Sequence, residues 1–153
     1  MPYKVFLNST EIKFSACHFL KEPDQCSRLH GHNYYVSIEV SDKLDDNYFV
    51  VDFIELNKKL EGIIKPMDHY ILIPTESKDL KITEDNDSIE IKSSGKRYVF
   101  PLSDVLLLPL PATTSELLAK YIHDKLKEIY KDKKIIVKVG ESKSTMASYT
   151  EKI

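Results

Sequence analysis

The chain has 153 residues, of which 42% are hydrophobic and 30% charged, so one domain with a buried core is expected. Its formal net charge of −2 gives no electrostatic reason to expect nucleic acid or an anionic membrane as a partner. Two Cys are too few for a disulfide framework, and polar residues interrupt every apolar run that could be a signal peptide or membrane span. These features predict a cytoplasmic protein with reduced thiols.

The N-terminal third predicts two strands. Residues 3–16 and 34–40 alternate between apolar and polar side chains, the period of a half-buried strand. Residues 42–47 resemble a turn, and "YFVVDF", residues 48–53, predicts a short extended piece.

Two amphipathic helices are predicted further along. Asp52 is placed to cap the first helix and Pro66 to stop it. Its expected apolar face is Phe53, Leu56, Leu60, Ile63 and Ile64. The second helix falls within residues 112–131, with an expected apolar face of Leu117, Leu118, Tyr121, Ile122, Leu126 and Ile129. His123, beside Asp124 in this helix, is expected at the surface.

The remaining segments predict strands. Residues 133–142 and 144–150 are two strand candidates, and Ser94-Gly95 between two alternating runs indicates a hairpin. The order strand, strand, helix, inserted hairpin, helix, strand, strand favours a single α+β domain over residues 1–153, with an antiparallel sheet.

Three histidines are predicted to meet at one end of the first strand pair. His30 and His32 are two residues apart and share the parity of the apolar face, and His18 shares the parity of the apolar face of its own strand. Gly31 lets another backbone or a ligand approach closely. If the strands pair as a hairpin, three imidazoles converge, which suits zinc and leaves a fourth position for water or substrate.

Two other interpretations stay open for these histidines. They are ordinary hydrogen-bonded residues, or Cys17 and Cys26 join them in a closed structural zinc site. Cys17 has the opposite parity to His18, which argues against its joining, and a Cys17–Cys26 disulfide is not expected in the cytosol.

Taken together, these motifs resemble the 6-pyruvoyltetrahydropterin synthase and 6-carboxytetrahydropterin synthase family. The matching stretches are "FSACH", "CSRLHGHNY", "VVDFIELNKKL", "MDHYIL", "PATTSELLAKYI" and "VKVGES". The resemblance implies the tunnelling fold (T-fold), with a four-stranded antiparallel sheet, two helices on one face, and homo-oligomers (hexamer or tetramer) whose sites lie between subunits. The segment at about residues 75–108 departs from the family's common form as an inserted β-hairpin. Its possible roles are to cover the substrate mouth, to contact another subunit or to decorate the surface, and decoration is the default expectation.

The resemblance also implies roles for particular residues. His18, His30 and His32 match the zinc ligands, and Cys26 matches a proton-shuttling thiol. Asp68 and His69 match the pair that completes the proton relay from a neighbouring subunit. Glu141 matches the carboxylate that anchors the pterin ring, and Glu116 matches a second acidic position near the pterin.

Each of these residues also has a structural interpretation. Asp68 and His69 could be turn residues, and Glu141 a solvated loop charge. Glu116 follows Thr113 at the spacing of a capping box and could only cap the helix.

The reaction that the resemblance implies is a zinc-dependent lyase step on the small molecule 7,8-dihydroneopterin triphosphate, giving 6-carboxy-5,6,7,8-tetrahydropterin for deazapurine nucleosides such as queuosine or archaeosine. The short Cys26-to-His30 spacing resembles the 6-carboxy branch. Triphosphate elimination by a 6-pyruvoyltetrahydropterin synthase is the alternative within the family. A non-catalytic, zinc-stabilised binding module is the alternative of another class.

Overall fold

The computed structural model describes residues 2–152, which separate into two compact units. The first unit contains the chain up to Phe14, Asn33–Pro66, and the chain from Ser115 onward. The second unit contains Ser15–His32 and Met67–Thr114. Strands β1 (Tyr3–His18) and β2 (His30–Asp42) each contribute to both units. That the whole chain forms one domain stays a prediction.

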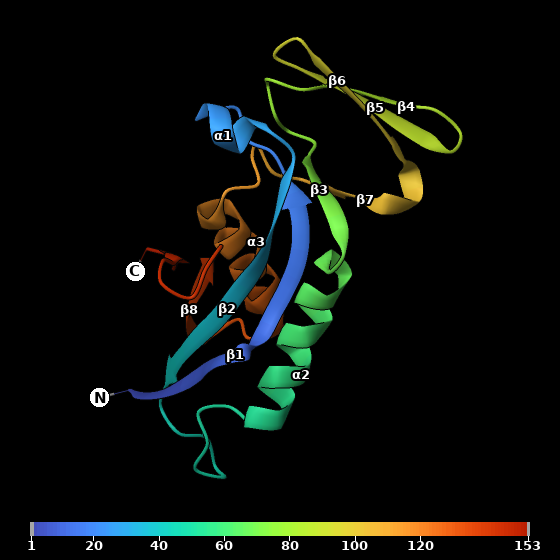
Figure 1. Cartoon of the computed structure of the whole chain (residues 1–153). Helices are drawn as coiled ribbons and strands as arrows, with labels where there is room; N and C mark the ends of the chain where they lie inside the picture. Colours follow the sequence, from blue (N-terminus) through green and yellow to red (C-terminus); the bar gives the residue numbers. More distant parts are fainter. Residues whose placement is uncertain (1, 153) are drawn as a thin grey trace. The chain divides into compact units, whose positions relative to one another are not determined.

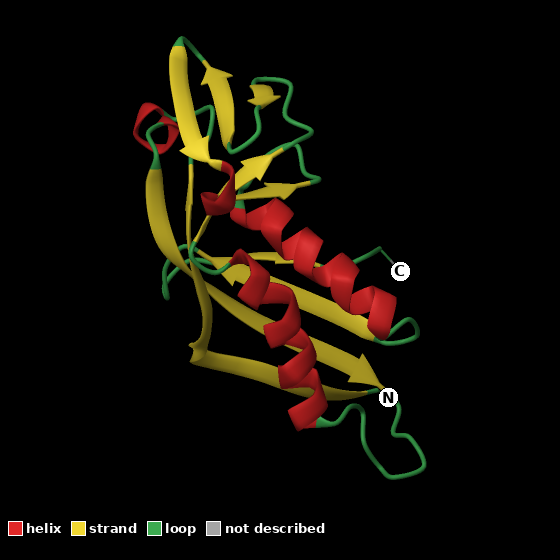
Figure 2. Cartoon of the chain, turned by 90° about the vertical axis from the view of Figure 1, so that its right-hand side faces the viewer, coloured by secondary structure: helices red, strands yellow, loops and turns green. Residues whose placement is uncertain are grey.

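The first unit is a layer of strands covered by two helices. Strand β2 pairs antiparallel with β8 (Lys134–Gly140), which pairs antiparallel with β9 (Ala147–Tyr149). Helices α2 (Phe53–Ile64) and α3 (Ser115–Ile129) lie side by side over one face of these strands (Figure 2). The α+β class predicted from the sequence is therefore confirmed.

The core of this unit follows the predicted periodicities, with exceptions at the helix ends. Fully or almost fully buried side chains on the predicted apolar faces include Tyr34, Val36, Ile38, Val40, Leu56, Leu60, Ile64, Leu118, Ile122 and Leu126. Phe14 stacks on Tyr34 with ring centroids 4.9 Å apart. The predicted burial of Phe53 and Ile129 is wrong, because these residues begin and end their helices and are 67% and 43% exposed.

The start of α2 is capped as predicted, but the segment before it is not extended. The Oδ1 atom of Asp52 accepts a hydrogen bond from the Glu55 amide at 2.8 Å. Residues 46–52 form turns and bends, and Tyr48 has a φ of 65°, which is incompatible with a strand. After Ile64 the chain continues as a single 3₁₀ turn, η1 (Lys65–Met67), which contains Pro66.

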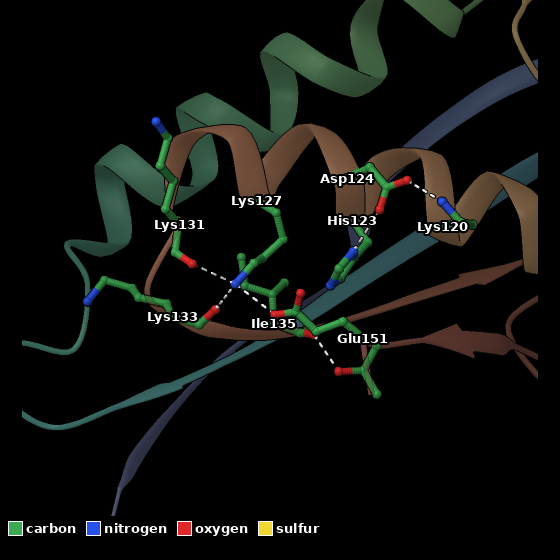
Figure 3. Close-up of polar contacts among 9 residues, drawn as sticks. Lys120, His123, Asp124, Lys127, Lys131, Lys133, Ile135 and Glu151 are labelled. Atoms are coloured by element: carbon green, nitrogen blue, oxygen red, sulfur yellow. Dashed lines mark hydrogen bonds and ion pairs between the residues drawn. The ribbon is translucent and has the colours of Figure 1, made fainter. Parts of the chain in front are cut away.

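The predicted surface position of His123 is wrong. Its side chain is only 2% exposed, and its ring lies edge-on against Tyr149 with centroids 4.9 Å apart. Its Nδ1 atom lies 3.1 Å from the Asp124 carboxylate (Figure 3). Further along α3, Lys127 donates hydrogen bonds to the carbonyls of Lys131 and Lys133, both at 2.8 Å. These contacts fix the turn that leads from α3 into β8.

The strands of the second unit change the predicted sheet. Strand β3 (Tyr70–Pro74) runs parallel to the end of β1 through the pairs Ala16↔Tyr70 and Cys17↔Ile71, and it also runs parallel to β7 (Val105–Leu108). The strand order is β7-β3-β1-β2-β8-β9. The prediction of a four-stranded antiparallel sheet is therefore wrong, because "YILIP" and "VLLL" add two parallel strands at one edge.

The inserted segment forms a second sheet of three strands rather than a hairpin alone (Figure 1). Its members, β4 (Lys81–Glu84), β5 (Ser88–Ser93) and β6 (Lys96–Pro101), are antiparallel neighbours and lead into the 3₁₀ turn η2 (Leu102–Asp104). The predicted turn at Ser94-Gly95 joins β5 to β6, and both residues have positive φ, 48° and 78°, as a type I′ hairpin turn requires. Within residues 2–152, no helix combines the length and apolarity needed to cross a bilayer.

Candidate metal centre and proton relay

Three histidines occupy the facing ends of β1 and β2 in the second unit. Strand β1 ends at His18 and β2 begins at His30, as the sequence predicts. The alternation that buries Ile12, Phe14 and Ala16 continues to His18, whose side chain is completely buried. Because side chains alternate along a strand, the imidazole of His18, the last residue of β1, lies on the inner face.

The three imidazoles converge. The ring centroids of His18 and His30 lie 4.7 Å apart, those of His30 and His32 4.8 Å, and those of His18 and His32 5.3 Å. One nitrogen from each ring lies within 4.8 Å of the other two. Gly31 brings its backbone close to β1, since a methyl group there would lie 3.3 Å from the Ala16 carbonyl oxygen. This arrangement could hold a metal ion with three imidazole ligands.

Backbone carbonyls fix the tautomers of two of these rings. The Nδ1 atom of His18 lies 3.0 Å from the carbonyl oxygen of Thr113, and that of His30 lies 2.6 Å from the carbonyl oxygen of Arg28. A carbonyl only accepts hydrogen bonds, so each Nδ1 must carry the proton and each Nε2 keeps its lone pair. Such outer contacts are typical of metal-binding histidines. The residues present therefore fit a metal ion bound through Nε2.

Burial keeps His18 in the form that a metal requires. Loss of hydration lowers the pKa of His18 from 6.5 to about 4, although the hydrogen bond to the Thr113 carbonyl opposes this effect. The nearby charges that protonated His30 and His32 would carry lower the pKa further. At neutral pH the His18 ring is therefore uncharged and able to donate its lone pair.

Neither thiol belongs to the metal-binding group found within residues 2–152. Cys17 and Cys26 are both free and half-buried, so the disulfide alternative is contradicted. Cys17 and His18 are adjacent in β1, and adjacent strand residues point to opposite faces of a sheet. Cys26 lies in the short helix α1 (Asp24–Ser27), in the connection between His18 and His30. Its amide donates to the Pro23 carbonyl at 2.9 Å, and its carbonyl accepts from the Leu20 amide at 2.8 Å.

Asp68 and His69 are more than turn residues, because both hold the backbone of β1. The Oδ1 atom of Asp68 accepts from the Ser15 amide at 2.8 Å, and the His69 amide donates to the Ser15 carbonyl at 2.6 Å. The Ser15 amide, and then His69, lower the pKa of the Asp68 carboxyl. The Oδ2 atom lies 2.7 Å from Nδ1 of His69, whose side chain is 80% exposed and whose φ is 65°. An oriented imidazole is therefore presented to solvent.

The two candidate carboxylates lie in the first unit, Glu116 at the start of α3 and Glu141 in the connection between β8 and β9. Glu116 is exposed in the first turn of α3, which begins at Ser115, so Thr114 rather than Thr113 precedes the helix. Glu141 follows β8 and is half-buried. Before it, Gly140 is covered so closely by residues 142–146 that a methyl group would overlap the Thr145 carbonyl.

Thr113 and Arg28 are contacts of the candidate site that the sequence analysis did not identify. The hydroxyl of Thr113 lies 3.2 Å from Nδ1 of His18, in addition to the carbonyl contact. Thr113 is 95 residues from His18 along the chain, and no local pattern indicates that pairing. For the contact between His30 and the Arg28 carbonyl, the sequence contains only a weak indication, namely that Arg28 lies two residues before His30.

Comparisons with known proteins place this geometry in context. The sequence model of a family described as 6-pyruvoyl tetrahydropterin synthase matches residues 8–152. A putative 6-carboxy-5,6,7,8-tetrahydropterin synthase of Methanocaldococcus jannaschii is 32% identical over 77% of this chain and 76% of its own length. A 6-carboxy-5,6,7,8-tetrahydropterin synthase of Aquifex aeolicus is 29% identical over 86% of this chain and 79% of its own.

Solved structures extend the similarity to the full length. The 6-pyruvoyl tetrahydropterin synthase of Plasmodium vivax superimposes with a TM-score of 0.91, covering 100% of this chain and 99% of its own at 28% identity. The corresponding Plasmodium falciparum protein also has a TM-score of 0.91 and 28% identity, covering 99% of each chain. Both superpositions include the inserted strands β4–β6.

Proposed function

Because the chain belongs to the 6-pyruvoyl tetrahydropterin synthase family of pterin lyases, we propose that it converts 7,8-dihydroneopterin triphosphate to 6-carboxy-5,6,7,8-tetrahydropterin with the help of zinc. The observation that carries the proposal is the convergence of His18, His30 and His32, two of them with their Nε2 lone pairs set by backbone carbonyls. The names of the M. jannaschii and A. aeolicus relatives support the 6-carboxy product.

We assign the three histidines as the zinc ligands. Bound zinc would act as a Lewis acid toward the oxygens of the pterin side chain, where negative charge develops when a neighbouring proton is removed. The protein's contribution is to hold the three imidazoles in place before zinc binds. Thr113 and Arg28 do this through His18 and His30, and the burial of His18 keeps its ring uncharged.

Cys26, Asp68 and His69 are proposed to move protons. The Asp68 carboxylate accepts the Nδ1 proton of His69, which leaves Nε2 as the nitrogen that takes up or releases a proton. Cys26 would be the other group that exchanges a proton with the substrate side chain. We propose that Asp68 and His69 act on the site of a neighbouring subunit in a homo-oligomer, for which the exposure of the His69 side chain is favourable.

Glu141 and Glu116 are proposed to select the substrate. An ionised carboxylate accepts two hydrogen bonds, which matches the paired N–H donors of an aminopyrimidinone ring. Glu141 is assigned as the anchor of the ring and Glu116 as a second acidic contact near it. The exposure of Glu116 leaves it accessible to a ligand, and the start of α3 at Ser115 weakens its alternative role in a capping box with Thr113.

A second candidate is triphosphate elimination to a 6-pyruvoyl product. The full-length similarity to the two Plasmodium structures, whose names state that activity, favours it. Incubation of the zinc-loaded protein with 7,8-dihydroneopterin triphosphate and mass spectrometry of the products distinguishes the two. Acetaldehyde together with a 6-carboxy pterin supports the first proposal. A 6-pyruvoyl pterin and triphosphate without acetaldehyde supports the second.

Two variants separate an enzyme from a zinc-stabilised binding module. Cys26→Ala should abolish turnover while zinc content and the unfolding transition stay as in the wild type. Loss of zinc or of folding in that variant contradicts the catalytic role and favours a structural site. His30→Ala should lose most of its zinc, because two imidazoles rarely retain the ion. Full zinc occupancy in His30→Ala, measured by elemental analysis, refutes the ligand assignment.

A further inference from the structure

The inserted sheet is attached to the segment that carries Cys26. This segment, residues 19–29, connects His18 to His30, and we name it the thiol segment. Its first residue, Phe19, is 6% exposed and shares a hydrophobic cluster with Ile89 and Ile91 of β5. The Phe19 ring also stacks on Tyr98 of β6, with centroids 4.8 Å apart and planes inclined by 18°. The inserted strands therefore fix the chain immediately after His18.

A second attachment holds the other end of the thiol segment. The Lys96 ammonium, at the start of β6, donates to the Ser27 carbonyl at 3.2 Å and lies 3.3 Å from the Ser27 hydroxyl. Ser27 is the last residue of α1 and follows Cys26 directly. Between the two ends, Lys21 pairs with Asp79 of the inserted segment at 3.0 Å. The attachments thus come before, within and after the turn that presents the thiol.

Internal hydrogen bonds connect these attachments to Cys26. The Leu20 amide donates to the Cys26 carbonyl at 2.8 Å, which joins the residue after Phe19 to the thiol-bearing residue. The Ser27 hydroxyl donates to the Asp24 carbonyl at 2.7 Å, which closes α1 at the residue that Lys96 contacts. Movement at Ser27 or Phe19 is therefore transmitted to Cys26 through few bonds.

We infer that the inserted strands β4–β6 hold the thiol segment in place and that Lys96 is a positioning residue for the Cys26 thiol. The inference rests on the proposed function insofar as Cys26 exchanges protons with the substrate. It replaces the expectation that the insertion is surface decoration, because decoration would not contribute both a ring that stacks on the buried Phe19 and a charged donor to a single loop.

The test compares Lys96→Met with Lys96→Arg and with the control Lys92→Met. Lys92 lies on β5 of the same sheet, is exposed, and pairs with Glu90 at 3.4 Å, so the control removes the same charge from the same sheet. The readouts are amide hydrogen exchange at Leu20 and Cys26, and alkylation of Cys26 by iodoacetamide, resolved from Cys17 by peptide mass spectrometry.

Lys96→Met should accelerate exchange at both amides and alkylation of Cys26 by about fivefold, the effect of losing an exposed charged contact. Lys96→Arg should restore the wild-type rates, and Lys92→Met should leave them unchanged. With pterin substrate, Lys96→Met should lower kcat while KM stays within about twofold, because geometry around the reacting proton changes and ring recognition does not.

Unchanged exchange and alkylation in Lys96→Met, or equal changes in Lys92→Met, overturn the inference. Faster exchange with an unchanged kcat also overturns it, since the thiol would then not depend on Lys96. If the wild type turns over no pterin, the proposed function fails, while exchange and alkylation still decide whether Lys96 positions the thiol.

Discussion

Buried His18 should make the metal-free protein lose stability in mildly acidic solution. The pKa of His18 is about 4 in the folded state and 6.5 without burial. Below pH 6.5 the unfolded chain therefore binds a proton that the folded chain rejects, and the free energy of unfolding decreases as the pH falls. The loss begins near pH 6.5 and is complete near pH 4. Between pH 7.5 and pH 5 these two pKa values give a loss of about 2 kcal/mol from His18 alone.

Urea unfolding of chelator-treated protein at pH 7.5 and pH 5 measures this loss, and His18→Leu removes the titrating ring. The variant should lose about 2 kcal/mol less than the wild type over this interval. Val137→Ala, at a fully buried aliphatic position, is the control and should lower stability equally at both pH values. Equal pH dependence in His18→Leu and the wild type would refute the reasoning.

Three further predictions test other parts of the structure. Gly140→Ala should destabilise the protein by about 3 kcal/mol in urea unfolding, because its methyl group overlaps the Thr145 carbonyl; a loss under about 1 kcal/mol contradicts the close packing. Leu56→Ala should cost about 2–5 kcal/mol, while Phe53→Ala on the same helix should cost under about 0.5 kcal/mol, and equal losses would show that their burial is misassigned. In Asp68→Asn the side chain has one acceptor oxygen for two donors, the Ser15 amide and the His69 ring. We therefore expect kcat to fall at least about tenfold while the zinc content stays unchanged, and a parallel loss of zinc argues against the proton relay.

Local periodicity was sufficient to predict most of the first unit and the convergence of the histidines. Strand parity alone placed His18 on the inner face, and the break between strands at residues 18 and 30 matches the structure. The parity of Cys17 argued against its joining the histidines, and Cys17 is not a member of the metal-binding group found within residues 2–152. These predictions succeed because they depend on one property, the alternation of side chains along a strand, which tertiary contacts rarely reverse.

Predictions failed where a distant contact determines the outcome. "YILIP" and "VLLL" are short apolar runs whose periodicity does not distinguish a parallel edge strand from a connection. Their partners, the end of β1 and each other, are set by the topology rather than by the local sequence. His123 is polar, and its burial is explained by a distant contact, the packing of the Tyr149 ring of β9 against it.

The hydrogen bonds that orient the histidines illustrate the same limit within the site. Which nitrogen of His18 carries the proton is decided by Thr113, 95 residues away, and the relevant atom is a backbone carbonyl that any residue would supply. A substitution at Thr113 therefore removes only the hydroxyl, at 3.2 Å, and leaves the carbonyl acceptor at 3.0 Å. Thr113→Val should accordingly change zinc affinity by less than about threefold, well below the roughly 10–100-fold typical of losing an outer-shell partner. Competition with a zinc-binding dye measures the affinity, and a larger loss would mean that the hydroxyl, rather than the backbone, orients the ring.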